Sequence, residues 1–172
     1  MEKKPLYTIG HGRRGSADFL ALLKKYGINY LVDVRSFPFS RFNPQYNQNA
    51  LKRFLEEHAV TYVFMGDELG GRPKDASCYS HGKIDYEKVK TKDFFKKGID
   101  RLKTAYSKDL DLAIMCSESK PEECHRARLI GRALALDRII VHHIDETGNI
   151  KDQVTVMSEL HKGFPPEDLF CS

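Results

Sequence analysis

The sequence has no apolar stretch long enough to cross a membrane or to act as a signal peptide. A membrane-spanning helix needs about 18–20 consecutive apolar residues, and no part of the chain approaches that length. The N-terminal stretch MEKKPLYTIGHG also lacks the continuous apolar core of a secretory signal. We therefore expect a cytoplasmic protein that has no membrane partner.

The number of cysteines and the net charge are both small. The four cysteines are scattered, and without a secretory signal they indicate free thiols rather than a disulfide framework. The net charge of +4 tolerates an anionic ligand, but it is too small to indicate nucleic-acid binding by itself. Repeats and low-complexity tracts are missing too, so we expect residues 1–172 to form one domain. Nothing in the sequence indicates an oligomeric state.

Short apolar runs alternate with amphipathic segments along most of the chain. The predicted strands lie near residues 6–10, 29–34, 60–64, 110–116 and 139–144. The predicted helices run from Ser16, as a cap, to Gly27, and over about 48–58, 93–106 and 124–136. Because strands that alternate with helices pair in parallel, the sequence predicts a three-layer α/β domain. Its mainly parallel sheet would have about five strands, with helices on both faces.

Two long polar segments, residues 36–49 and 66–81, are predicted to be loops. Loops longer than about 12–15 residues usually carry function or move. The first loop and its flanks are basic and aromatic, with Arg35, Phe37, Phe39, Arg41, Phe42 and Tyr46. These side chains could stack on bases, or they could anchor the loop by burying their rings. The C-terminal end, with Gly163, Pro165 and Pro166, is predicted to be a short helix and a loose tail.

Polar residues follow several of the predicted strands. Ligands of parallel sheets bind beyond the carboxyl ends of the strands, where such residues meet. The segments concerned are Gly10–Gly12, Asp33–Arg35, Gly66–Glu68, Cys116–Glu118 and His143–Asp145. Asp33 and Arg35 point to the same side of their strand because strand residues two apart do. They could pair with each other or cap a helix, or Arg35 could grip an anion while Asp33 orients it.

The segment MCSESKPEECHR, residues 115–126, carries the largest group of reactive side chains. It follows a buried strand and opens a predicted helix, whose N-terminus would favour anions and thiolates. Cys116 could equally be a small buried hydrophobe. Zinc binding by Cys116, Cys124, His125 and His11 is a further alternative, but the Cys-x7-Cys-His spacing is not that of common zinc sites. We expect Cys124, or Cys116 if it is open to the pocket, to react faster than Cys78 in its polar loop.

Five motifs resemble those of one protein family. In chain order they are Tyr7–His11, Val32–Pro38, Asn43-Pro44 with Tyr46-Asn47, Glu68–Arg72, and Met115–Glu118 with Cys124–Arg126. Together they look like the bacterial and archaeal family called domain of unknown function 488, over roughly residues 6–145. Gly12 stands where members of that family often have a serine. The resemblance implies a fold and the positions of a site rather than a reaction.

A second similarity, to rhodanese-like domains, concerns architecture only. Those domains also have a strand that ends in Asp-Val-Arg and a later strand that runs into a cysteine loop and a helix. Here Glu118, Glu122 and Glu123 place negative charge where a rhodanese loop cradles an anion. This charge argues against a persulfide or phosphatase loop.

We expect an enzyme that acts on a phosphate-bearing ligand, such as a nucleotide or a nucleic-acid end. The predicted catalytic residues are His11, Asp33, Glu118, Cys116 and His125, and the predicted ligand-binding residues are Arg35, Arg41, Asn43, Arg72 and Arg126. Arg35 and Arg126 would hold the anion, and His11 or His125 would transfer protons. Glu118 would orient the ligand or act as a base, and Cys116 would be a nucleophile only with a lowered pKa.

The alternative function is a non-catalytic module that binds nucleic acid or another ligand. In that case the loop from Arg35 to Tyr46 would make the contact and the cysteines would be structural. Binding that depends strongly on salt, without turnover, would favour this alternative. Neither hypothesis requires a cofactor or a metal ion.

Overall fold

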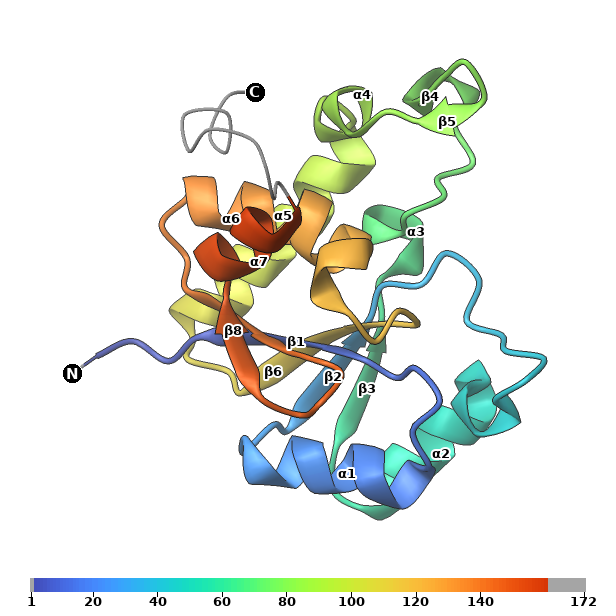
Figure 1. The fold of residues 1–172 in the computed structure, drawn as a ribbon, viewed down its shortest axis with the longest axis vertical. Coiled ribbons are helices and arrows are strands. Elements are labelled where there is room, and N and C mark those ends of the chain that lie inside the picture. The colour runs from blue at the N-terminus through green and yellow to red at the C-terminus, as the bar shows by residue number, and fades with distance from the viewer. Residues whose placement is uncertain (1, 161–172) are drawn as a thin grey trace.

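A computed structural model gives the fold of the protein and describes residues 2–160. Its main sheet has six strands in the order β3-β2-β6-β1-β7-β8. Their bounds are β1 Leu6–Gly10, β2 Tyr30–Asp33, β3 Thr61–Phe64, β6 Leu112–Cys116, β7 Val141–Ile144 and β8 Ile150–Asp152. All neighbours pair in parallel except β7 and β8. The fold is therefore the predicted α/β fold with a mostly parallel sheet, shown in Figure 1.

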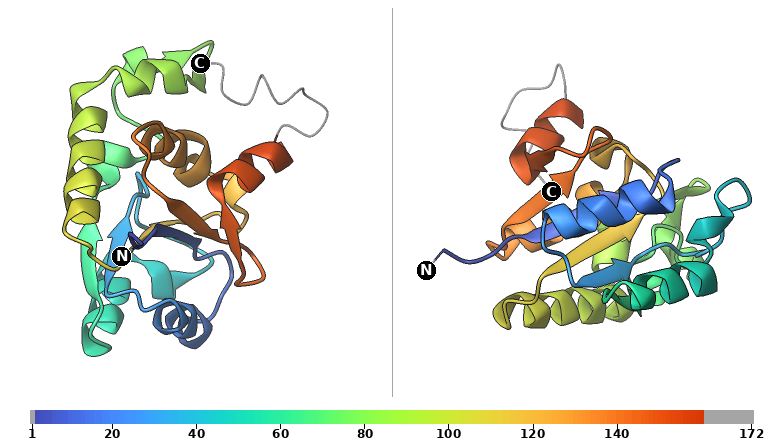
Figure 2. Two further views of the ribbon diagram at one scale, coloured as in Figure 1. Left: turned by 90° about the vertical axis from the view of Figure 1, so that its left-hand side faces the viewer. Right: turned by 90° about the horizontal axis from the view of Figure 1, so that it is seen from below.

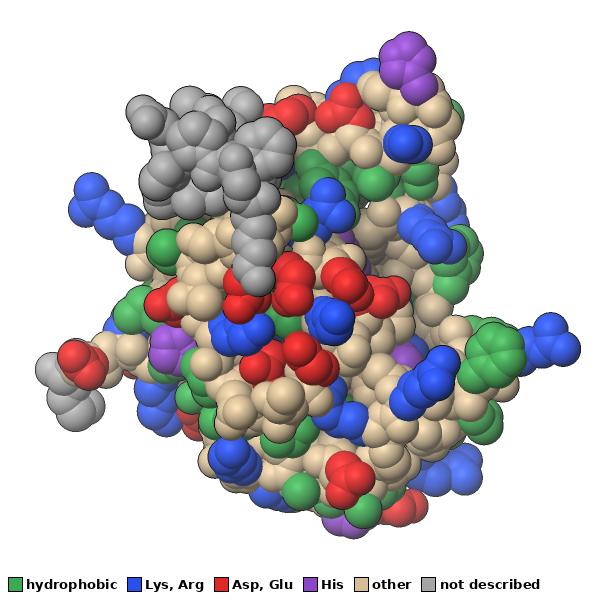
Figure 3. Space-filling view, in the orientation of Figure 1, with side chains coloured by type: hydrophobic (Ala, Val, Ile, Leu, Met, Phe, Trp, Pro, Cys, Tyr) green, Lys and Arg blue, Asp and Glu red, His purple; other side chains and the backbone are tan. Residues whose placement is uncertain are grey.

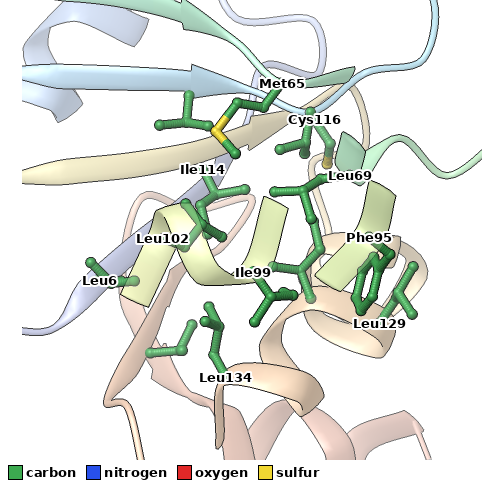
Figure 4. Packing of buried hydrophobic residues seen from close by; sticks show 14 of the residues in the cluster. Leu6, Met65, Leu69, Phe95, Ile99, Leu102, Ile114, Cys116, Leu129 and Leu134 are labelled. Carbon is green, nitrogen blue, oxygen red and sulfur yellow. The ribbon is translucent and has the colours of Figure 1, made fainter. Parts of the chain in front are cut away.

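Helices cover both faces of the sheet. The helices are α1 Ser16–Lys25, α2 Gln48–Glu57, α3 Gly66–Leu69, α4 Tyr86–Lys90, α5 Asp93–Ser107, α6 Arg132–Leu136 and α7 Gln153–Leu160. In Figure 1, α1 and α2 lie below the sheet, and α5, α6 and α7 lie above it; Figure 2 shows the same layers from two other sides. Alternate residues of β6 enter the two cores: Ile114 packs on the α5 side and Met115 on the α1 side. Figure 4 shows the α5 side, where the Cys116 side chain leaves the end of β6 close to Leu69.

The five predicted strands are all present, but two details of the expected βαβ unit differ. β1 and β2 are parallel as expected, yet β6 lies between them and pairs with both. Ser16 is the first residue of α1 and makes no capping hydrogen bond, so the predicted cap is wrong. Gly27 does follow the helix with a φ of +66°, which explains why a glycine ends it.

Several elements were not predicted from the sequence. The segment 66–81, expected to be a loop, contains α3, a 3₁₀ turn over Ala76–Cys78 and the strand β4 Tyr79–Ser80. β4 forms an antiparallel hairpin with β5 Lys83–Ile84. Two more 3₁₀ turns cover Pro44–Tyr46 and Pro121–Glu123, and the predicted helix near residue 124 begins as a π-helical turn, Arg126–Gly131, before α6. The predicted loose tail lies outside the described residues, as does Cys171.

No helix within residues 2–160 has both the length and the apolar character that a membrane span needs.

Candidate active site

A cavity of about 850 Å³ opens beyond the carboxyl ends of β1, β2 and β6. It brings together seven of the ten predicted site residues, namely His11, Arg35, Arg41, Arg72, Cys116, Glu118 and His125. These residues come from five separate parts of the chain, and the parallel sheet aligns the ends of the strands that carry them. Figure 3 shows the surface hollowed on the right-hand side, below the lobe that carries β4 and β5.

Asp33 and Arg35 form a buried ion pair at the floor of this cavity. The Asp33 carboxylate accepts hydrogen bonds from Arg35 Nε at 2.9 Å, from Arg35 Nη2 at 2.8 Å and from the Tyr62 hydroxyl at 2.6 Å. Arg35 Nη2 also donates to the Tyr46 carbonyl, which leaves Nη1 as the nitrogen that faces His11. The pairing interpretation is therefore correct, and Arg35 has one nitrogen left for an anion. Asp33 itself does not line the cavity.

His11 lies between Arg35 and the ring of Tyr46. Its ring stacks on Tyr46 with the centroids 4.2 Å apart, and its Nδ1 is 2.8 Å from the Gly12 carbonyl. Because only a protonated nitrogen can donate to that carbonyl, Nε2 carries the lone pair and faces Arg35 Nη1 at 3.5 Å. Burial lowers the pKa of His11 to about 4, against the effect of the Gly12 hydrogen bond. His11 is thus a neutral acceptor aimed into the site.

The segment after Cys116 lies directly over the end of β1. A Cβ atom placed on Gly10 would lie 1.7 Å from the Glu118 carbonyl oxygen, so no larger residue fits beneath that backbone. His11 N–H and Gly12 N–H also donate to the carbonyls of Cys116 and Ser117. The two strand ends are therefore fixed to each other, and the exposed Glu118 side chain stands at the junction.

Arg126 is fully buried behind the cavity, so the expectation that it lines the pocket and holds a ligand is wrong. Its guanidinium donates to the Thr8 hydroxyl, to the Ile144 carbonyl and, at 3.0 Å, to the Ser119 carbonyl. Its Nε has no hydrogen-bond partner. No carboxylate among residues 2–160 pairs with it.

The neighbours of Arg126 are neutral. Thr8 Oγ1 lies 2.7 Å from His143 Nδ1, and His143 Nε2 lies 2.6 Å from Gln153 Oε1. Because Gln153 Oε1 can only accept, His143 carries its proton on Nε2 and accepts from Thr8. Burial and the positive charge of Arg126 lower the pKa of His143 to about 3. The interior therefore holds an arginine charge with no carboxylate of the described residues within 4.0 Å.

Cys116 is the thiol that this charge favours. Burial alone raises the pKa of the Cys116 thiol, but hydrogen bonding from Cys124 and the charge of Arg126 outweigh it and lower the pKa. Burial and the adjacent Cys116 raise the pKa of Cys124 well above its usual value. Cys124 lies just before the helical segment that begins with the π-helical turn Arg126–Gly131 and continues into α6. These directions favour Cys116 over Cys124 as the more acidic of the two thiols.

Cys78 does not have the surroundings predicted for it. It is fully buried in a 3₁₀ turn rather than exposed in a polar loop, and burial raises its pKa. The thiol that was expected to be an ordinary exposed reference is therefore a core residue.

Two aromatic walls flank the cavity. Phe37, Phe39 and Phe42 are 62, 70 and 88% exposed, and Tyr79 and Tyr86 line the opposite wall. In Figure 1 the loop after β2 and the hairpin β4–β5 project on the same side of the molecule. The three phenylalanines are therefore available to a ligand.

Tyr46, the fourth ring of the aromatic loop, behaves differently. It is buried against His11 and Phe19, so for this ring the anchoring interpretation holds and a role in stacking on bases is excluded.

A second cavity of about 640 Å³ continues from the first. The two share His11, Ser40, Ser117 and Glu118, and Asn43 lines only the second. Several residues of these cavities were not predicted from the sequence, namely Arg13, Arg14, Ser36, Tyr79 and Tyr86. Tyr79 and Tyr86 flank the turn of the hairpin, and the apolar residues on either side of His81-Gly82 are the signal that could have revealed it.

Zinc binding would require at least three metal-ligating side chains close together. Within the part of the chain that the structure describes, no three His, Cys, Asp or Glu side chains are grouped so that they could hold a metal ion. Of the four ligands considered, His125 is committed elsewhere: Nε2 bonds to the Val34 carbonyl and Nδ1 faces Cys124.

Three histidines have lowered pKa values, and we therefore predict that the protein loses stability in mild acid. The pKa values of His11 and His125 are lowered to about 4 and that of His143 to about 3, mainly by burial. A histidine in the unfolded chain has a pKa near 6.5. At pH values between 6.5 and the lowered pKa values, the unfolded chain binds more protons than the folded chain. The free energy of unfolding therefore falls as the pH falls. Each histidine should contribute up to about 1.4 kcal/mol per pH unit.

Urea unfolding at pH 7, 6 and 5 measures this slope. His143→Gln should flatten the dependence by the share of one histidine, whereas the exposed His58→Gln should leave it as in the parent protein. A free energy of unfolding that does not change over this range would contradict the prediction.

These features define an α/β domain with a thiol, a histidine and a paired arginine at the carboxyl edge of its sheet. The chain matches the family model described as domain of unknown function DUF488 over residues 16–133, more than half of its length, and it belongs to that family. The resemblance seen in the sequence is thereby confirmed, although the His11 motif precedes the matched segment. No curated protein and no solved structure matches the chain.

Proposed function

We propose that this protein is an enzyme that acts on a phosphate-bearing ligand, a nucleotide or a nucleic-acid end, with Cys116 as its nucleophile. The observation that carries the proposal is the placement of Cys116, His11 and Arg35 on one cavity, with a buried arginine charge behind the thiol. A thiolate is the nucleophilic form of cysteine, and a nearby cation favours it.

Each residue has a role that its contacts allow. Arg35 Nη1 would bind a phosphate oxygen, while Asp33 holds the other side of the guanidinium. After Cys116 has displaced the leaving group, the lone pair on His11 Nε2 would take a proton from the water or hydroxyl that attacks the cysteine-bound intermediate and frees the thiolate. An anion bound to Arg35 would increase the basicity of His11. Arg126 does not touch the ligand; it acts on Cys116 through its charge.

The aromatic walls support a ligand with a planar ring. The three exposed phenylalanines and Arg41 lie on one wall, and Arg72 adds a second exposed cation. Neither Arg41 nor Arg72 has an ion-pair partner among residues 2–160. Stacking of a base on an aromatic side chain contributes about 1–3 kcal/mol, which is enough to favour a nucleotide over inorganic phosphate.

The test is a screen of nucleoside 5′-phosphates and of short single-stranded oligonucleotides with a phosphate at either end, with products identified by mass spectrometry. We expect turnover by the parent protein and at least a hundredfold loss in Cys116→Ser, because serine is a far weaker nucleophile in this setting. Cys78→Ala, which lies off the cavity, is the matched control and should retain activity.

The exposed phenylalanine loop also supports a second candidate, a non-catalytic binding module. In that case no substrate would turn over, oligonucleotides would bind with a strong salt dependence, and Cys116→Ser would bind as well as the parent protein. Turnover that persists in Cys116→Ser would overturn the nucleophile assignment.

A further inference from the structure

A second thiol, which the proposed function does not use, lies beside Cys116. Cys124 lines the same cavity, belongs to the same apolar cluster and is close enough to Cys116 for each thiol to shift the pKa of the other. Both residues are only 2% exposed, and the cavity is the route by which a small reagent reaches them. Two neighbouring thiols that line one cavity are the arrangement from which a disulfide can form.

His125 is placed to remove the proton from Cys124. Its Nε2 lies 3.1 Å from the Val34 carbonyl, which accepts only, so the ring proton is on Nε2. The lone pair is therefore on Nδ1, which lies 3.5 Å from Cys124 Sγ. Gly71 packs on the other side of this ring, where an added Cβ would come within 3.1 Å. The imidazole is thus held between two backbone segments with its acceptor facing the thiol.

We propose that Cys116 and Cys124 are a site of reversible oxidation by hydroperoxides, in which Cys116 is oxidised first and Cys124 then forms a disulfide with it. In the first step the Cys116 thiolate attacks the distal oxygen of ROOH. The S–O bond forms, the O–O bond breaks, and the alkoxide takes a proton to leave as ROH. In the second step the Cys124 sulfur attacks the sulfenic sulfur of Cys116 while the Cys124 proton passes by way of His125 Nδ1 toward the leaving oxygen. The sulfenic hydroxyl receives that proton and leaves as water.

The roles of the two cysteines follow from their surroundings. The positive charge of the buried Arg126 acts on Cys116, which suits the thiol that reacts first. Cys124 remains protonated until His125 accepts its proton, which suits the thiol that reacts second. Cys78 does not line the cavity and has no such partner. This inference does not depend on the proposed function, but it implies that oxidation would remove the proposed nucleophile.

The test oxidises the full chain with one equivalent of hydrogen peroxide, blocks free thiols with N-ethylmaleimide and maps the peptides. Trypsin leaves both cysteines in the peptide 109–126, because the bond after Lys120 precedes a proline. We expect this peptide with a mass two hydrogens lower than the reduced form and without N-ethylmaleimide on either cysteine. Dithiothreitol should return it to the reduced form. Cleavage after Glu118 and Glu122 should then give two peptides that remain joined through sulfur.

Two variants separate the steps. Cys124→Ser should stop at a sulfenic acid on Cys116 that dimedone traps, and His125→Gln should form that acid at the parental rate but close the disulfide at least tenfold more slowly. Circular dichroism establishes that both variants are folded. The proposal is overturned if Cys116 goes to sulfinic acid with Cys124 present, if either residue bonds to Cys78 or Cys171, or if both stay reduced.

Discussion

Cys116 is expected to react with iodoacetamide at pH 7 at least ten times faster than Cys78 or Cys124. Its pKa is lowered, whereas burial raises the pKa of Cys78 and burial and the adjacent Cys116 raise that of Cys124. Alkylation follows the fraction of thiolate, so the lower pKa gives the faster rate. Labelling rates of the three sites between pH 5 and 9, measured by mass spectrometry, test this order. If Cys78 is labelled first, Cys116 is a packing residue and covalent catalysis is ruled out.

The arginine behind the site provides the matched variant for this experiment. Arg126→Met keeps an apolar side chain of similar length and removes the charge, so the midpoint of Cys116 labelling should move to higher pH. Each pH unit of that movement lowers the rate at pH 7 about tenfold. Arg128→Met, two residues along the same turn on an exposed position, should leave the midpoint in place. An unchanged midpoint in folded Arg126→Met would show that Arg126 does not act on the thiol.

Asp33→Ala is expected to lower the free energy of unfolding by about 3–5 kcal/mol. The carboxylate is completely buried and accepts two hydrogen bonds from the Arg35 side chain and one from Tyr62. Removal of the carboxylate leaves a guanidinium that is 5% exposed without its counter-ion, and an uncompensated buried charge is costly.

Urea denaturation of the parent protein and the variant gives this difference directly. Glu87→Ala removes the exposed partner of Lys90 and should lower the free energy of unfolding by less than about 1 kcal/mol. It is therefore the control for the loss of an exposed ion pair. A cost for Asp33→Ala that is no larger than the control value would mean that Arg35 finds water or another partner. In that case its orientation in the site would not depend on Asp33.

The sheet was predictable because its strands are short apolar runs bounded by turn residues, and this pattern is local in sequence. The insertion of β6 between β1 and β2 was not predictable, since periodicity says which residues form strands and not which strands become neighbours. The hairpin β4–β5 has only two residues in each strand and is too short for a periodic signal.

The site was predicted to the extent that the ends of parallel strands meet at one edge. That rule located His11, Arg35, Cys116 and Glu118 together, but it does not say how deeply each side chain is buried. Arg126 was expected to hold an anion because it lies in the segment that follows a buried strand and opens a helix. The π-helical turn instead directs it inward onto Thr8, and only three-dimensional packing determines that direction.

Because β6 lies at the centre of the sheet, the sheet can be completed only late in synthesis of the chain. The two partners of β1 are encoded long after it, β6 about 100 residues later and β7 about 130 residues later. At about 5–20 residues per second the ribosome needs several seconds to deliver them. Throughout that interval the Leu6–Gly10 segment has neither neighbour, and β2 can pair only with β3. Nascent chains stalled before residue 110 should therefore be sensitive to protease and bound by chaperones, and the protein should become compact only when the second half has left the exit tunnel.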